Sequence, residues 1–142
     1  MMNNENRQVL VVEDDRTIRR LLHECLEDEG YRVREAAHGE EALEILEHWQ
    51  PDVIVLDLMM PRMDGWAFRA EQRHLQRGVD IPLVVLSASR DSVAAGEEMG
   101  AAAVVGKPFD LDTFLDVVHA CIELGTGASS LSTQSPLSLD AP

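Results

Sequence analysis

Three short runs of consecutive aliphatic residues constrain the fold of this chain more than any other feature of its sequence. They lie at residues 9–12, 53–56 and 83–86, and none of them contains a polar residue. A strand with one face in water alternates apolar and polar residues, whereas a strand buried on both faces is apolar throughout. The runs therefore predict three strands at the centre of a parallel sheet that is covered on both sides.

The remaining segments predict how that sheet is completed. Two more strands are expected at 31–35, where polar and apolar residues alternate as in an edge strand, and at 101–105. Between the strands, apolar residues recur at helical spacing in 18–26, 42–49, 66–76, 91–99 and 111–122. Five strands alternating with five helices predict the α/β class: a doubly wound, five-stranded parallel sheet in the order 2-1-3-4-5, flavodoxin-like in type.

The two ends of the chain differ in composition from this central region. Residues 1–8 are polar and are expected to form a short leader, and residues 9–124 carry the domain. Residues 125–142 are rich in Gly, Ser, Thr and Pro, with Asp140 as the only charged residue. Such a segment has too little apolar surface to fold alone, so a flexible tail or linker is expected.

Charge and cysteine content narrow the possible partners and location. The net charge is −14, from 26 acidic and 12 basic residues, which argues against direct binding to nucleic acid or to an anionic membrane. There is no apolar stretch of membrane-spanning length and no apolar signal region at residues 1–8. Cys25 and Cys121 have no metal-site spacing and are expected to be buried, reduced thiols. A cytoplasmic protein is expected.

Reactive side chains follow the predicted strands at the points where these strands end. Glu13 and Asp14 follow the first strand, Asp57 follows the third, Ser87 ends the fourth and Lys107 comes just after the fifth. In an open parallel sheet these ends lie on one edge, where ligands bind. The sequence therefore predicts that carboxylates, a hydroxyl and an ammonium converge there.

This combination suits phosphoryl transfer to a carboxylate. Clustered carboxylates repel one another unless a cation neutralises them, and Mg²⁺ prefers such oxygen ligands. Glu13 and Asp14 are the best metal ligands, and Asp57, at the mouth of a central strand, is the best nucleophile. Lys107 is the only lysine among the 12 basic residues and could neutralise phosphoryl oxygens, to which Ser87 could donate.

Taken singly, each of these residues also has an ordinary structural explanation. The acidic triplet 13–15 could simply cap the following helix, and Asp15 suits that role. Asp57 could be a turn residue, Ser87 alone says little, and a single lysine could arise by chance. The joint pattern favours function because every residue lies at a predicted strand end on the same side.

Four segments at these strand ends form a recognisable set of motifs. They are Val11-Val12-Glu13-Asp14-Asp15, Val55-Leu56-Asp57-Leu58-Met59-Met60-Pro61-Arg62-Met63-Asp64-Gly65, Leu86-Ser87-Ala88 and Gly106-Lys107-Pro108-Phe109. With them, the sequence over residues 8–124 resembles the response regulator receiver domains of two-component signalling.

The resemblance implies that Asp57 is the phospho-acceptor, that Glu13 and Asp14 hold Mg²⁺, and that the backbone carbonyl of Met59 completes the metal site. It also implies that Ser87 is the switch hydroxyl and that Lys107 contacts the phosphoryl group, with a cis bond before Pro108.

The resemblance also implies partners. A histidine kinase or a phosphotransfer protein would supply the phosphoryl group, and a downstream protein target would read the resulting change. The domain would catalyse its own phosphorylation and dephosphorylation without being an enzyme in the usual sense. Many relatives carry an aromatic residue where this chain has Val104, so a different packing change would have to transmit the signal. Ala101, Ala102 and Ala103 offer no charges for a salt-bridged dimer, so a monomer or weak homodimer is expected.

Two other functions are compatible with parts of the pattern. A phosphatase of the haloacid-dehalogenase type also uses an aspartate at a strand end with Mg²⁺. It needs a second carboxylate two positions later, where this chain has Met59. A pseudo-receiver, which keeps the fold as a protein-binding module without the chemistry, is the remaining alternative.

Overall fold

The computed structural model describes residues 6–58, 65–75, 81–87, 94, 96–98 and 100–124. A parallel sheet of five strands runs through the centre of the molecule in the order β2-β1-β3-β4-β5. The predicted topology is therefore confirmed. The strands are β1 (Gln8–Val12), β2 (Arg32–Ala36), β3 (Val53–Asp57), β4 (Leu83–Ser87) and β5 (Ala103–Gly106).

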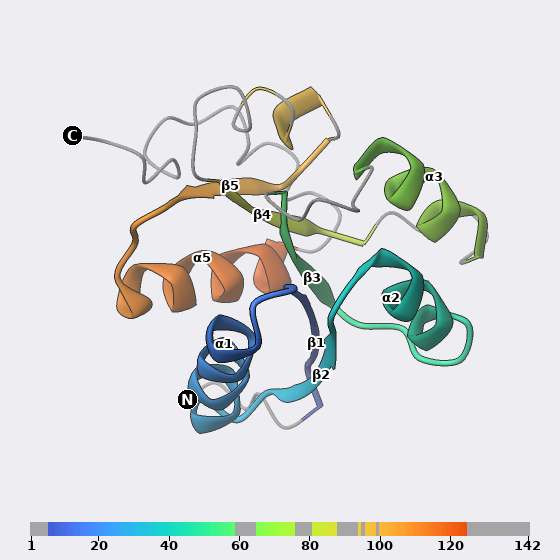
Figure 1. Ribbon diagram of the computed structural model, residues 1–142. Helices are drawn as coiled ribbons and strands as arrows, with labels where there is room; N and C mark the ends of the chain where they lie inside the picture. The colour runs from blue at the N-terminus through green and yellow to red at the C-terminus, as the bar shows by residue number, and fades with distance from the viewer. Residues whose placement is uncertain are drawn as a thin grey trace.

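Helices cover both faces of this sheet (Figure 1). α1 (Arg16–Asp28) and α5 (Leu111–Leu124) lie on one face, and α2 (Gly39–Leu46) and α3 (Gly65–Leu75) lie on the other. Most of the helix predicted at 91–99 lies outside the described residues, although residues 94 and 96–98 are helical. The predicted leader and tail lie largely outside them as well.

Alternate residues of the three apolar runs face the two helical layers. Val9, Val53 and Val84 pack with α1 and α5, whereas Leu10 and Ile54 pack with α2 and α3. All the residues of β3 and β4 are buried, while β2 alternates between exposed and covered positions until its last residue. The predicted distinction between central strands and the β2 edge strand is therefore confirmed, and its cause is burial on both faces.

α2 ends sooner than the sequence pattern indicates, at Leu46 instead of Trp49. The helix ends there in a tighter turn, in which the N–H of Glu47 donates to the carbonyl three residues earlier, that of Glu44. Trp49 thus leaves the helical stripe. Its indole N–H donates to Gln8 Oε1 at 3.0 Å, and the guanidinium of Arg34 lies 4.9 Å from its ring centroid. These contacts give Trp49 a position at the amino-terminal end of the sheet.

The cysteine prediction is half right. Both thiols are free, and Cys121 is buried on the core-facing side of α5, where burial raises the pKa of its thiol to about 12. Cys25 on α1 is only partly covered, because its position lies at the border of the apolar stripe. No helix in the described part of the chain is long and apolar enough to cross a membrane.

Phe114 offers a test of this packing. The side chain is fully buried, and its ring lies 5.6 Å from that of Phe109. We expect Phe114→Ala to lower the free energy of unfolding by about 3–5 kcal/mol, through lost burial and the cavity left behind. Leu21→Ala, at an exposed position of α1, should change it by less than about 0.5 kcal/mol. Urea denaturation followed by circular dichroism measures both, and equal losses would contradict this core assignment.

Candidate functional site

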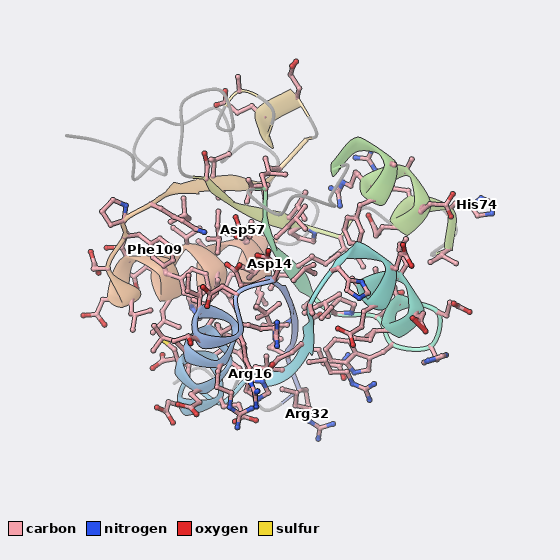
Figure 2. The ribbon with its side chains drawn as sticks, in the orientation of Figure 1. Asp14, Arg16, Arg32, Asp57, His74 and Phe109 are labelled. Carbon is pink, nitrogen blue, oxygen red and sulfur yellow. The ribbon has the colours of Figure 1, made fainter. Side chains whose placement is uncertain are left out.

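The carboxyl ends of the strands bring the predicted site residues to one edge of the sheet. Asp57 is the last residue of β3 and Ser87 the last of β4, and the register pairs Asp57 with Leu86. Glu13 and Asp14 follow β1, and Lys107 follows β5. Figure 2 shows Asp14 and Asp57 near each other at this edge, with Arg32 at a distance. The predicted convergence on one edge is therefore present in the structure.

Three polar side chains of this edge are almost completely buried. The exposed fractions are 1% for Glu13, 2% for Asp57 and 1% for Ser87, whereas Asp14 is exposed. Removing an ionised carboxylate from water is costly unless an opposite charge or hydrogen bonds compensate. Two buried carboxylates side by side therefore require positive charge nearby.

Lys107 supplies part of that charge. Its Nζ lies 3.1 Å from Asp57 Oδ2 and 3.8 Å from Glu13 Oε1. The backbone N–H of Lys107 donates to the carbonyl of Ser87 at 2.6 Å, which holds the residue beside the end of β4. The peptide bond between Lys107 and Pro108 is cis, as expected from the resemblance. One ammonium thus faces two carboxylates.

The carboxylate of Glu13 is only partly compensated by its surroundings. Its Oε2 accepts the backbone N–H of Asp15 at 3.1 Å, but its Oε1 is buried and has no hydrogen-bond partner within the described part of the chain. Burial raises the pKa of Glu13 to about 8, and Asp57 alongside adds to this rise. The N–H of Asp15 and the ammonium of Lys107 oppose it. This environment favours either a proton or a further cation at Glu13.

The donor set fits a hard divalent ion. One carboxylate oxygen each from Glu13, Asp14 and Asp57 can be chosen so that all three lie within 4.8 Å of one another. Mg²⁺ binds oxygen ligands of this kind, and Glu13 Oε1, which accepts no hydrogen bond in the described part of the chain, is available as one of them. Met59, whose carbonyl was expected to join them, lies outside the described residues.

The sequence assigned Asp15 only to helix capping, and it has a second role. Its side chain accepts the N–H of Ile18 at 3.0 Å and caps α1, as predicted. Its own N–H holds Glu13 Oε2 at the same time. The position of this capping residue, directly after the two predicted metal ligands, is the sequence signal from which its contact with Glu13 could have been predicted.

Val104 lies in β5 on the face opposite α5 and is buried. A Cβ built on Gly96 would approach Val104 Cγ2 to 3.1 Å, so the backbone at Gly96 packs closely on this side chain. A large aromatic ring at position 104 would not fit without movement of the surrounding residues. Val104, in place of the aromatic residue that the family resemblance implies, is therefore matched by close packing around it.

The comparison with known protein families decides what kind of domain this is. A sequence model described as the response regulator receiver domain matches residues 9–119. This chain belongs to the response regulator receiver family. The receiver domain covers the whole of the five-stranded sheet except the first residue of β1, and it contains every predicted site residue.

Curated relatives and solved structures that resemble this chain are also response regulators or their receiver domains. Response regulator MprA of Mycolicibacterium vanbaalenii is 41% identical over 94% of this chain, and MprA of Mycobacterium leprae is 42% identical over 81%. The chain spans 60% and 50% of the lengths of these two relatives. The Francisella response regulator 1452 receiver domain is 32% identical with a TM-score of 0.73, covering 83% of this chain and 98% of its own. The Vibrio cholerae chemotaxis protein CheY4 is 33% identical with a TM-score of 0.72, and the match covers 80% of this chain and 97% of CheY4.

The raised pKa of Glu13 predicts how the metal-free receiver responds to pH. A pKa near 8 in the folded state, above the ordinary value of 4.5, favours the protonated form. This contribution to stability is complete below about pH 4.5 and is lost as the pH rises through about 8. We therefore expect Glu13→Gln, which carries no charge, to gain stability relative to the native chain between about pH 5 and about pH 9.

Urea denaturation at both pH values, with and without Mg²⁺, tests this expectation. Mg²⁺ should stabilise the native chain at the higher pH and leave Glu13→Gln nearly unaffected. The control is Glu24→Gln, because the Glu24 side chain on α1 is 60% exposed. A Glu13→Gln variant with the same pH dependence and Mg²⁺ response as the Glu24→Gln control would contradict the assignment.

Proposed function

We propose that this receiver domain accepts a phosphoryl group on the carboxylate of Asp57 and signals through the resulting change in conformation. The observation that carries the proposal is the partly buried contact of Asp57 with Lys107, next to a buried Glu13 oxygen that has no hydrogen-bond partner among the described residues. Burying charged groups costs desolvation free energy. Clusters of buried ionisable groups are therefore typical of functional sites. An arriving anion and a divalent cation would together balance it.

Each residue has a defined part in the proposed reaction. A carboxylate oxygen of Asp57 forms a bond to phosphorus as the bond from phosphorus to the donor's imidazole nitrogen breaks. Glu13 and Asp14, with Asp57, would hold Mg²⁺, which when bound supplies positive charge to phosphoryl oxygens. Lys107 supplies the same kind of charge from the β5 side, and Ser87 donates a hydrogen bond once the phosphoryl group is present.

The proposed donor is the phosphohistidine of a histidine kinase or of a phosphotransfer protein, because this chain belongs to the receiver family. With a net charge of −14, we expect the domain to signal to a downstream protein rather than to bind nucleic acid itself. The receiver catalyses the addition and loss of its own phosphoryl group, and no separate substrate is turned over.

Acetyl phosphate, a small phosphodonor, tests the acceptor directly. We expect intact-mass spectrometry of the full chain with acetyl phosphate and Mg²⁺ to show one added phosphoryl group. The adduct should be absent in Asp57→Asn and when Mg²⁺ is chelated. A native chain that binds Mg²⁺ but forms no adduct would contradict the proposal and favour a pseudo-receiver. Continuous release of phosphate from simple monoesters would instead indicate a phosphatase.

Lys107 should control the rate of this reaction. Removing one group that stabilises charge in a transition state typically slows transfer, so we expect Lys107→Met to reduce the phosphorylation rate on the order of 100-fold. The matched control is Arg32→Met, which removes a positive charge from the opposite end of the sheet, where Arg32 pairs with Gln8. Time courses of adduct formation measure both, and equal rates in the two variants would argue against a role for Lys107.

A further inference from the structure

Arg19, on α1, contacts the acidic segment that follows β1. Its Nη1 donates to the backbone carbonyl of Glu13 at 2.8 Å, and its Nε donates to Glu35 Oε1 at 3.1 Å. The side chain is 16% exposed. The carbonyl that it binds belongs to the peptide group between Glu13 and Asp14. Arg19 thus fixes the one peptide plane that joins the two proposed metal ligands.

The other polar atoms of Glu13 are also held. Its N–H donates to the carbonyl of Ala36 at 3.0 Å, and its Oε2 accepts the N–H of Asp15 at 3.1 Å. Glu13 Oε1 has no hydrogen-bond partner in the described part of the chain, and it faces the ammonium of Lys107 at 3.8 Å. Arg19 therefore completes a set of restraints that leaves a single carboxylate oxygen of Glu13 available to a cation.

Glu35, in the edge strand β2, holds Arg19 in turn. Its second oxygen accepts Arg20 Nη1 at 3.2 Å and contacts His23 Nδ1. Partial burial would raise the pKa of Glu35, but the hydrogen bonds from Arg19, His23 and Arg20 outweigh it and hold the pKa below its ordinary value. Glu35 is therefore an anion at neutral pH. A planar guanidinium can bind this carboxylate and the Glu13 carbonyl at the same time.

Arg20 provides an internal comparison. It also joins α1 to Glu35, but its side chain is 61% exposed and it pairs with Glu24 and Glu35. If Arg19 only tied the helix to the edge strand, the two arginines would be equivalent. The contact with the Glu13 carbonyl is what distinguishes Arg19.

We propose that Arg19, anchored by Glu35, is a positioning residue for the divalent cation: it orients the peptide between Glu13 and Asp14 so that both carboxylates serve one ion. The inference rests on the proposed function, because it assumes that these carboxylates bind Mg²⁺. It assigns a part to an arginine that does not itself touch the phosphoryl group or the ion.

Electrostatics and positioning predict opposite effects of removing Arg19. Loss of a positive charge near a cation site lowers repulsion, so charge alone predicts tighter Mg²⁺ binding. Loss of the restraint on the ligand-bearing peptide predicts weaker binding. Groups that orient metal ligands typically contribute about 10-fold to 100-fold in affinity, so the positioning effect should dominate.

The test is a titration of the ¹⁵N-labelled full chain with Mg²⁺ alone, followed by nuclear magnetic resonance, which also shows whether each variant is folded. We expect Arg19→Met to weaken Mg²⁺ binding by about 10-fold or more. Arg20→Met, the matched change of charge, should bind as tightly as the native chain or slightly more so. Arg19→Lys keeps the charge but lacks the rigid planar fork that holds both acceptors, so it should also bind Mg²⁺ more weakly than the native chain. It also serves if Arg19→Met does not fold.

The results separate the two levels of the proposal. Native or tighter Mg²⁺ affinity in both Arg19 variants, or equal weakening by Arg19→Met and Arg20→Met, would overturn the role of Arg19. A native chain that binds no Mg²⁺ would overturn the proposed function itself. Phosphorylation is not needed for this titration, so a failure of Asp57 to accept a phosphoryl group is detected separately, by intact-mass spectrometry.

Discussion

The contact between Lys107 and Asp57 is the interaction on which the site depends. It places an ammonium 3.1 Å from a carboxylate oxygen at the mouth of a central strand, in surroundings where both Asp57 and Glu13 are almost fully buried. One positive charge does not balance two carboxylates. Burial raises the pKa of Glu13, and the neighbouring Asp57 adds to the rise. We propose that this deficit of positive charge favours binding of a cation, and that the cation in turn prepares the site for an anionic phosphoryl group.

The sheet topology makes this arrangement possible. Strand order 2-1-3-4-5 places β1, β3 and β4 side by side, so side chains from segments far apart in the sequence meet at one edge. Apolar strands buried by two helical layers hold these ends in fixed register. The same order puts β2 next to β1, where Glu35 can reach α1 and support Arg19. The edge strand therefore contributes to the site although none of its residues belongs to the reactive group.

Sequence patterns predicted the sheet because continuous apolar runs have few other stable placements, and they predicted the meeting of Asp57 and Lys107 because parallel strands end on one edge. They could not predict contacts that depend on the phase of a helix or the end of its last turn. Arg16, Arg19 and Arg20 are alike in sequence, and only packing selects the one that reaches the Glu13 carbonyl. The early end of α2 is likewise set by local backbone bonds.

Chemical mapping of the phosphorylated residue tests the role of Asp57 most directly. The full chain is treated with acetyl phosphate and Mg²⁺, reduced with borohydride, which converts an acyl phosphate of aspartate to homoserine, and mapped by peptide mass spectrometry. We predict homoserine at position 57 alone, formed only when Mg²⁺ is present. Homoserine at another aspartate, or an unmodified Asp57 in a chain that has gained a phosphoryl group, would contradict it.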